Sequence, residues 1–317
     1  MNEFEIIRRF FSPGTDHTVL AGGDDAALIS VSPGMELAVS TDLLLADRHF
    51  FADAEPYGVG HKAMAVNLSD MAAMGARPRW ATLSLALPVA EERWLEQFAH
   101  GFLDLSRSHQ VDLIGGDTTR GPLAICVQIL GEVPPGKALK RSGAHAGDDL
   151  WVSGHLGDAA LALAHIRGDF ELHGQDRDHA LKRLNQPQPR VALGEGLVGL
   201  ASACIDVSDG LVADVGHVAE ASGLRAVIEW VSVPLSAVAE RYRRHPLVQR
   251  AALAGGDDYE LAFSASPSLR TELGALSGSL GLALTRIGRL EPGAGVTVLD
   301  EARNPLVLAE SGFDHFR

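Results

Sequence analysis

The segment AGGDDAAL, residues 21–28, carries a Gly-Gly-Asp core that returns twice along the chain. AGGDDYEL occupies residues 254–261, and GGDT occupies residues 115–118. A single Gly-Gly-Asp is typical of a tight turn, because glycine accepts positive φ and aspartate bonds to nearby backbone. All three copies stand beside apolar runs that are typical of strands. Each copy alone is best interpreted as a turn, but the repetition at strand ends makes a functional role worth testing.

The composition is that of a globular protein large enough for two domains, with 317 residues, 46% hydrophobic and 21% charged. The formal net charge of −14 repels nucleic-acid phosphates and anionic membranes, so neither is expected as a partner. Cys126 and Cys204 stand far apart, which excludes a disulfide framework and suits a reducing cytoplasm. The N-terminal MNEFEIIRRFF lacks a long apolar core, so no signal peptide or membrane anchor is expected.

Short apolar runs alternate with longer helical patterns in both halves of the chain. In residues 61–76, Met64, Leu68, Met71 and Gly75 recur at helical spacing, which predicts a helix. The other elements predicted in the first half are strands at 26–31, 36–42, 79–88, 111–117 and 122–133 and a helix at 91–109. Those predicted in the second half are strands at 150–154, 203–210, 224–230, 258–265, 283–290 and 295–300 and helices at 156–166 and 211–223. Residues 168–190 are polar and are expected to be mostly surface.

A domain boundary is predicted in EVPPGKALKRSGAHAGDD, residues 132–149, which is rich in Pro, Gly and Lys. We therefore expect an N-terminal α/β domain over residues 1–135, a linker over 136–148 and a C-terminal domain over 149–317. Neither a short-period repeat nor a low-complexity tract interrupts this arrangement.

Aspartates end several apolar strands or interrupt apolar helices. The set comprises Asp24, Asp25, Asp42, Asp70, Asp117, Asp206 and Asp209. Asp42 alone could cap a turn, and Asp209 alone could be a helix N-cap. Asp70 is harder to dismiss, because it lies among small apolar residues of a helix, where an unpaired carboxylate would be costly. A cation or a hydrogen-bond donor is expected to meet it.

Converging carboxylates tolerate one another when a hard cation lies between them, and Mg²⁺ prefers oxygen ligands and accompanies phosphates. Zinc is disfavoured, because the histidines have no partners at metal-ligand spacing. The phosphate-binding motif GxxxxGK[ST] and the protein-kinase signatures are absent from the sequence. A GxGxxG occurs at Gly194–Gly199, but it follows no strand, so we interpret it as a helix of small residues.

Eight motifs follow one another along nearly the whole chain: GDDAAL (23–28), STDLLLADRHF (40–50), AVNLSDMAAMGARP (65–78), LIGGDTTRGP (113–122), RSGAHAGD (141–148), IDVSDGL (205–211), GGDDYEL (255–261) and GFDHF (312–316). In this order they resemble the thiamine-monophosphate kinase family. That family shares a superfamily with aminoimidazole ribonucleotide synthetase and selenophosphate synthetase. The resemblance implies ATP-dependent, Mg²⁺-dependent phosphorylation of thiamine monophosphate, which is the last step of thiamine diphosphate synthesis.

The resemblance also implies a two-domain synthetase-type fold and a set of site residues. The N-terminal α/β domain would pair its mixed sheet with that of a second copy in a homodimer, and the C-terminal domain would be α+β. ATP and thiamine monophosphate would bind in a cleft between the domains. The implied Mg²⁺ ligands, for several ions, are Asp25, Ser40, Thr41, Asp42, Asp70, Asp117, Asp206 and Asp209. The implied ATP contacts are Gly116, Asp117, Arg141 and Ser208, and the implied substrate contacts are His49, Asp257 and Phe313.

Two positions depart from the family pattern. The third Gly-Gly-Asp copy usually reads GGEDYEL, so Asp257 is one methylene shorter than the usual glutamate. Phe313 stands where Trp or Tyr is also common, and its ring can stack on thiamine but offers no donor.

No acid–base or nucleophilic residue is predicted, because the acceptor phosphate has a second pKa of about 6 and is a dianion at neutral pH. Arg141 would add positive charge, although alone it reads as a surface linker arginine. Three alternatives remain open: a sister enzyme that uses the same ATP site, a two-metal phosphatase or nuclease, and a nucleotide-binding regulator without turnover.

Overall fold

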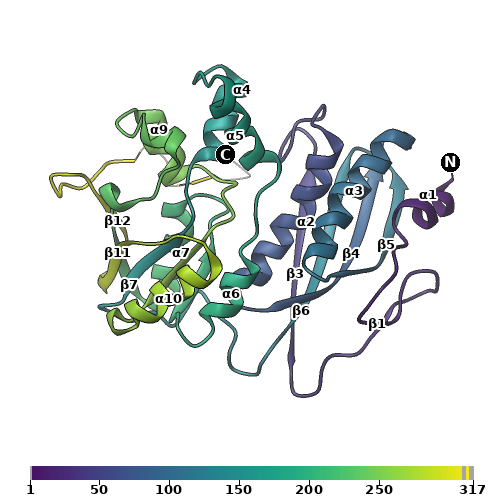
Figure 1. Cartoon of the computed structure of the whole chain (residues 1–317), viewed down its shortest axis with the longest axis horizontal. Coiled ribbons are helices and arrows are strands. Elements are labelled where there is room, and N and C mark those ends of the chain that lie inside the picture. The colour runs from purple at the N-terminus through teal and green to yellow at the C-terminus, as the bar shows by residue number, and fades with distance from the viewer. Residues whose placement is uncertain (1, 309–311, 314–317) are drawn as a thin grey trace. The chain divides into compact units, whose positions relative to one another are not determined.

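The computed structural model describes residues 2–308, 312 and 313, and it divides into two compact units. The first unit comprises Met1–Met71 and Ala76–Gly136, and the second comprises Ala72–Gly75 and Lys137–Arg317. Each unit combines helices with a sheet of at least four strands, which confirms the mixed α/β class predicted from the sequence (Figure 1).

A four-stranded mixed sheet in the order β3-β6-β4-β5 forms the base of the first unit. Its elements are α1 (Glu3–Phe10), β1 (Thr18–Leu20), β2 (Leu28–Ile29), β3 (Glu36–Leu45), α2 (Pro56–Ala73), β4 (Arg77–Leu87), α3 (Glu92–Ser108), β5 (Asp112–Arg120) and β6 (Ala124–Val133). Only β4 and β5 are parallel, and α3 provides the long crossover that a parallel pair requires. The strand predicted at 26–31 shrinks to the two residues of β2, which pair only with β1.

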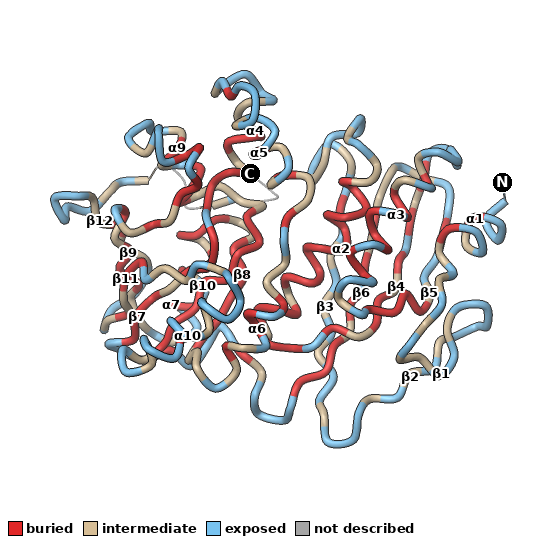
Figure 2. Tube along the Cα trace, viewed as in Figure 1, coloured by how far each residue is buried: buried red, intermediate tan, exposed pale blue. Residues whose placement is uncertain are grey.

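The helices α2 and α3 pack against each other at backbone distance. A Cβ on Gly101 of α3 would lie 1.9 Å from the carbonyl oxygen of Tyr57 in α2. A Cβ on Gly60 of α2 would lie 2.1 Å from the carbonyl oxygen of Phe98 in α3, so both crossing points require glycine. Residues 58–69 of α2 are buried throughout, as Figure 2 shows, and the half-buried Asp70 follows directly.

β3 alternates between a covered face and an open face. Ser40 and Asp42 are half-buried on the face that also carries the buried Leu44. The open face carries large apolar side chains that are 39% to 53% exposed: Leu37, Val39, Leu43 and Leu45. Single exposed apolar residues are common, but four on one strand form an unusual apolar surface for an edge strand.

Glu132, near the end of β6, links the segment before β3 to β4 through hydrogen bonds. Its buried carboxylate accepts hydrogen bonds from the amide of Ser32 (2.6 Å), the hydroxyl of Ser32 (3.1 Å) and Nε of Arg79 (3.2 Å). Burial raises the pKa of Glu132, but the hydrogen bonds from Ser32 and the charged Arg79 outweigh it and hold the pKa below its usual value.

Glu132→Gln is expected to lower the free energy of unfolding at neutral pH by about 1–3 kcal/mol, because charge-assisted hydrogen bonds are lost. The folded pKa lies below the ordinary value of 4.5, so this contribution is complete above that pH and disappears as the pH falls through the folded pKa. Urea titrations of wild type and variant should therefore differ near neutral pH and converge in acid. A difference that stays constant across this range would contradict the ionic role of Glu132.

The second unit is built on a six-stranded sheet in the order β12-β9-β11-β7-β10-β8, in which only β12 and β9 are parallel. Its longer elements are β7 (Asp149–Ser153), α4 (Asp158–Arg167), α5 (Gly174–Asn185), α6 (Val191–Leu197), β8 (Ala203–Asp206), α7 (Leu211–Ser222), β9 (Leu224–Glu229), α9 (Pro246–Ala254), β10 (Leu261–Ala265), α10 (Arg270–Leu280), β11 (Leu284–Pro292) and β12 (Gly295–Leu299). The shorter ones are Trp230–Ser232, α8 (Ala237–Glu240) and Pro267–Leu269.

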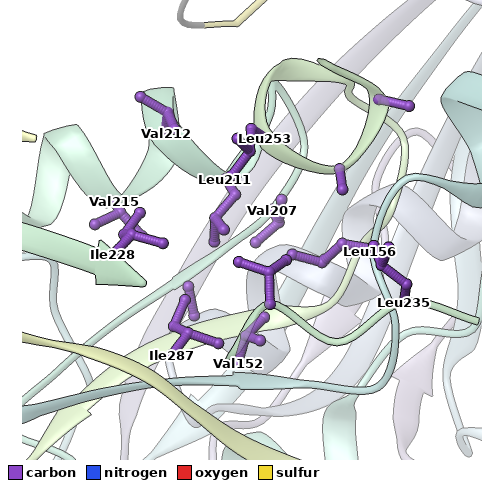
Figure 3. Close-up of a cluster of buried hydrophobic side chains, with 14 of the residues drawn as sticks. Val152, Leu156, Val207, Leu211, Val212, Val215, Ile228, Leu235, Leu253 and Ile287 are labelled. Atoms are coloured by element: carbon purple, nitrogen blue, oxygen red, sulfur yellow. The ribbon is translucent and has the colours of Figure 1, made fainter. Parts of the chain in front are cut away.

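The core of the second unit lies between this sheet and α7. Val152 of β7, Leu211 of α7 and Ile287 of β11 are fully buried there, together with Val215 and Ile228 (Figure 3). Gly194–Gly199 lies largely in α6, which confirms the helical interpretation of that motif. Residues 168–190 are mostly exposed or half-buried, as predicted, and they also contain α5, whose Ala180 and Leu184 are buried.

Candidate functional site

In the first unit, the predicted ligands of β3 and α2 lie together. The hydroxyl of Ser40 donates a hydrogen bond to Oδ2 of Asp70, so the half-buried carboxylate has the donor that the sequence required. Asp42 shares the face of Ser40 on β3. Thr41 lies on the opposite, open face, where its hydroxyl accepts a hydrogen bond from Nε2 of Gln128 at 3.4 Å. The structure therefore places Ser40, Asp42 and Asp70 on one side of the sheet and the Thr41 side chain on the other.

Two of the three Gly-Gly-Asp copies are neighbours in space. A Cβ on Gly22 would lie 3.7 Å from the carbonyl oxygen of Ile114 and 3.8 Å from Cα of Gly115. The first copy therefore packs on β5 immediately before the second copy. Asp25 is exposed in this loop, and its amide donates to Oδ1 of Asp24 at 2.9 Å.

Gly116 is required where β5 meets β4. Its φ is +145°, and a Cβ there would lie 1.8 Å from the carbonyl oxygen of Leu83, so no other residue fits without displacing backbone. Leu83 is also opposite Val127 of β6, and Val127 is opposite Asp42 of β3. Gly116 and Asp42 thus share a row across the sheet, about 14 Å apart at the usual strand spacing.

Asp117 stands one position further along β5 and pairs with Ser84. Because successive side chains alternate, Asp117 is directed to the opposite face from Leu83 and Asp42. Asp117 is exposed, and its Oδ1 accepts a hydrogen bond from the amide of Thr118 at 2.9 Å.

His49 lies in the loop after β3. Its Nδ1 accepts a hydrogen bond from the amide of Leu45 at 3.0 Å, which assigns the ring proton of the neutral imidazole to Nε2. The backbone carbonyl of His49 accepts from Nζ of Lys62 at 3.3 Å, which ties the loop to α2.

In the second unit, the loop between β8 and α7 is shaped by Asp214. Its Oδ2 accepts hydrogen bonds from the amides of Ser208 (3.0 Å), Asp209 (3.1 Å) and Gly210 (3.1 Å). Burial raises the pKa of Asp214 to about 7, and the nearby Asp209 carboxylate adds to the rise. The N-cap of α7 is Gly210, so the alternative that Asp209 caps this helix is wrong.

Sequence reasoning missed Asp214, although it left one signal. An acid in the first helical turn after a Ser-Asp-Gly loop is well placed to accept the amides of that loop.

The third Gly-Gly-Asp copy packs on the same loop. The amide of Asp257 donates to the carbonyl of Ser208 at 2.9 Å. A Cβ on Gly256 would lie 2.4 Å from that carbonyl oxygen, so the contact requires glycine. The amide of Phe313 donates to the carbonyl of Asp209 at 2.9 Å. Residues from three distant segments therefore meet beside the end of β8, where Asp206 is buried. Residues 314–316 of the terminal GFDHF motif lie outside the described residues.

Arg141 does not join this group within the second unit. Its carbonyl accepts a hydrogen bond from the hydroxyl of Ser222 at 3.4 Å, and Ser222 is the last residue of α7. Ser208 precedes the first turn of the same helix, whose 12 residues span about 18 Å. Arg141 is exposed.

The donors predicted to hold Mg²⁺ are all oxygen atoms, which suits a hard cation. Six of them, Asp25, Ser40, Thr41, Asp42, Asp70 and Asp117, belong to the first unit, and Asp206 and Asp209 belong to the second. Within residues 2–308, 312 and 313, no three His, Cys, Asp or Glu side chains form a ready metal cluster. Each ligand assignment remains a prediction.

Comparison with known proteins identifies the class to which this fold and these loops belong. Residues 23–133 match the family described as AIR synthase related protein, N-terminal domain, and residues 145–301 match its C-terminal domain. A thiamine-monophosphate kinase of Escherichia coli K12 is 41% identical over 318 residues, covering 99% of this chain and 98% of that protein. This chain therefore belongs to the thiamine-monophosphate kinases, a family of phosphate-transferring enzymes.

Two solved structures agree with this membership. The crystal structure of thiamine-monophosphate kinase from Stenotrophomonas maltophilia K279a is 46% identical, with a TM-score of 0.85, covering 89% of this chain and 91% of that one. The structure described as AaThiL complexed with AMPPCP and TMP is 31% identical, with a TM-score of 0.79, covering 90% of this chain and 89% of that one. In the part of the chain that the structure describes, no helix is both long and apolar enough to cross a membrane.

Proposed function

We propose that this chain transfers the γ-phosphate of ATP directly to thiamine monophosphate, in line and with Mg²⁺, to give thiamine diphosphate. Family membership supports the reaction, and the related AaThiL was solved with AMPPCP and TMP. The observation that carries the proposal is the meeting of Asp257 and Phe313 with the Ser208–Asp209 loop. A carboxylate and an aromatic ring beside this loop suit a cationic, aromatic substrate.

The proposed roles follow the family motifs residue by residue. Asp257, Phe313 and His49 would contact thiamine monophosphate. Gly116, Asp117, Arg141 and Ser208 would contact ATP. The oxygens of Asp25, Ser40, Thr41, Asp42, Asp70, Asp117, Asp206 and Asp209 would hold Mg²⁺. When bound, Mg²⁺ would neutralise the phosphate oxygens that otherwise repel one another.

The residues of this chain would bind and orient ATP and thiamine monophosphate, and none of them would need to take a proton from the acceptor phosphate. The acceptor phosphate is a dianion at neutral pH, because its second pKa is about 6, so it needs no general base. Asp214 would keep the loop of Ser208 and Asp209 in one shape through its three amide hydrogen bonds. The left-handed backbone of Asp257 (φ 68°) would direct its carboxylate from a fixed loop.

We also propose that the chain is a cytoplasmic homodimer. The apolar open face of β3, formed by Leu37, Val39, Leu43 and Leu45, supports pairing between the sheets of two first units. Cys126 and Cys204 are both free thiols, which suits a reducing compartment.

A direct assay tests the reaction. Purified chain, ATP, Mg²⁺ and thiamine monophosphate should yield ADP and thiamine diphosphate in equal amounts, with little ADP when the acceptor is omitted. Release of inorganic phosphate without thiamine diphosphate would instead identify a phosphatase.

No phosphoenzyme is expected during the reaction. The candidate carboxylates are proposed as metal ligands, and the acceptor is nucleophilic without help. Incubation with γ-labelled ATP in the absence of acceptor, followed by quenching, should leave no label on the protein. Stoichiometric, alkali-labile label would contradict direct transfer.

A further inference from the structure

The segment that carries Asp257 is held in an unfavourable backbone conformation. Asp257 and Tyr259 both have positive φ, at 68° and 51°, which costs a non-glycine residue about 1 kcal/mol or more each. Such a conformation persists only where its surroundings fix it. The strand predicted at 258–265 begins only at Leu261 for this reason.

Glu260 fixes the downstream end of this segment. It is 0% exposed, and Oε2 accepts hydrogen bonds from Nε of Arg190 (2.6 Å) and from the hydroxyl of Ser153 (2.6 Å). Its Oε1 accepts from Nη2 of Arg183 at 2.9 Å and from Nη2 of Arg190. Arg190 thus makes a two-nitrogen contact, which a lysine cannot reproduce.

The backbone at Gly154 leaves room for the Glu260 carboxylate, and the neighbouring Asp258 has a buried anchor of its own. Gly154 has a φ of +57°, and a Cβ there would lie 2.2 Å from Oε1 of Glu260. Asp258 is also buried, and both of its oxygens accept the amide of Gly157 at 2.9 Å. Nη2 of Arg183 reaches the carbonyl of Asp258 at 3.4 Å, so alternate residues of the segment are anchored inward.

Tyr259 contacts Asp257 itself, which is half-buried. Its hydroxyl donates to Oδ1 of Asp257 at 3.0 Å, and Tyr259 as a residue is only 9% exposed. The bond fixes the direction of a carboxylate that is one methylene shorter than the glutamate usual at this position. Buried ion pairs add little net stability on average. We therefore interpret the buried pair of Arg190 and Glu260, which lies beside this strained segment, as a device that positions the segment.

We propose that Arg190 and Tyr259 are positioning residues for the substrate contact of Asp257: Arg190 holds the segment through Glu260, and Tyr259 holds the carboxylate itself. This inference rests on the proposed function. The loop of Ser208 and Asp209 has a separate anchor in Asp214, so disturbance of residues 257–260 should affect thiamine monophosphate more than ATP.

The test compares Arg190→Lys and Tyr259→Phe with a control, Arg270→Lys. Arg270 also grips a buried carboxylate with two nitrogens, Nε to Oδ2 of Asp149 at 2.6 Å and Nη2 to Oδ1 at 2.8 Å. That pair lies at the other end of the same two strands, because Asp149 pairs with Ala265 in the β7–β10 ladder. Steady-state kinetics and Tm are measured for each full-length variant.

We expect Arg190→Lys to raise KM for thiamine monophosphate at least about tenfold, because a displaced Asp257 would lose its charge-assisted contact with the substrate. KM for ATP should stay within about twofold of wild type. Tyr259→Phe should raise KM in the same direction with an unchanged Tm, and Arg270→Lys should leave both KM values unchanged.

Unchanged KM for thiamine monophosphate in both variants, or an equal rise in the control, would overturn the positioning role alone. A wild-type protein that forms no thiamine diphosphate would overturn the proposed function and this inference together. Tyr259→Phe keeps the test decisive if Arg190→Lys fails to fold.

Discussion

Asp70→Asn is expected to abolish turnover while the fold remains intact. The amide has the shape of the carboxylate and can still accept the hydrogen bond from Ser40, but it has no charge with which to bind a cation. Activity at saturating Mg²⁺ should fall by far more than tenfold. A tenfold loss alone corresponds to about 1.4 kcal/mol of transition-state stabilisation. Asp42→Asn, on the same face of β3, should behave alike.

The control for this prediction is thermal stability. Both variants should melt within a few degrees of wild type, because an asparagine side chain has the same shape as the aspartate it replaces. Retention of more than about a tenth of wild-type activity would contradict metal ligation by the altered residue.

Asp257→Ala is expected to weaken the apparent affinity for thiamine monophosphate by about tenfold or more, because a charge-assisted contact of about 1.5–3 kcal/mol is lost. Asp257→Glu should be tolerated, since glutamate is usual at this position in the family. KM for ATP should change little in either variant. If Asp257 only shapes the turn before β10, Ala would instead lower Tm and change both KM values equally, and Asp257 would leave the substrate site.

Local patterns in the sequence predict most of the elements and their class. The apolar spacing of α2 is a local property, so its helical character could be recognised without any partner, although the helix runs over Pro56–Ala73 rather than the predicted 61–76. The pattern could not show α5, whose buried Ala180 and Leu184 are too few to stand out in a polar stretch.

Contacts between distant residues explain the rest of the misses. Arg190 reads as a surface residue until Glu260 is known to lie opposite it, 70 positions downstream. Asp214 is the exception, because its three amide partners lie only four to six positions upstream. The faces of Asp42 and Asp117 follow from pairing across four strands, which no single segment encodes. Motif order predicts a set of site residues, whereas strand register decides which of them are neighbours.

The position of β7 has a consequence for how the chain reaches this structure. β7 lies between β10 and β11, and Trp151 pairs with Phe263 on one side and Arg286 on the other, both more than a hundred positions downstream. The first sheet is complete by Val133. At ribosomal rates of about 5–20 residues per second, both edges of β7 stay unpaired for roughly 5–20 s, until β10 has been made. The second unit is therefore exposed to misassociation during synthesis, and arrest of translation before β11 should leave a nascent chain that binds chaperones.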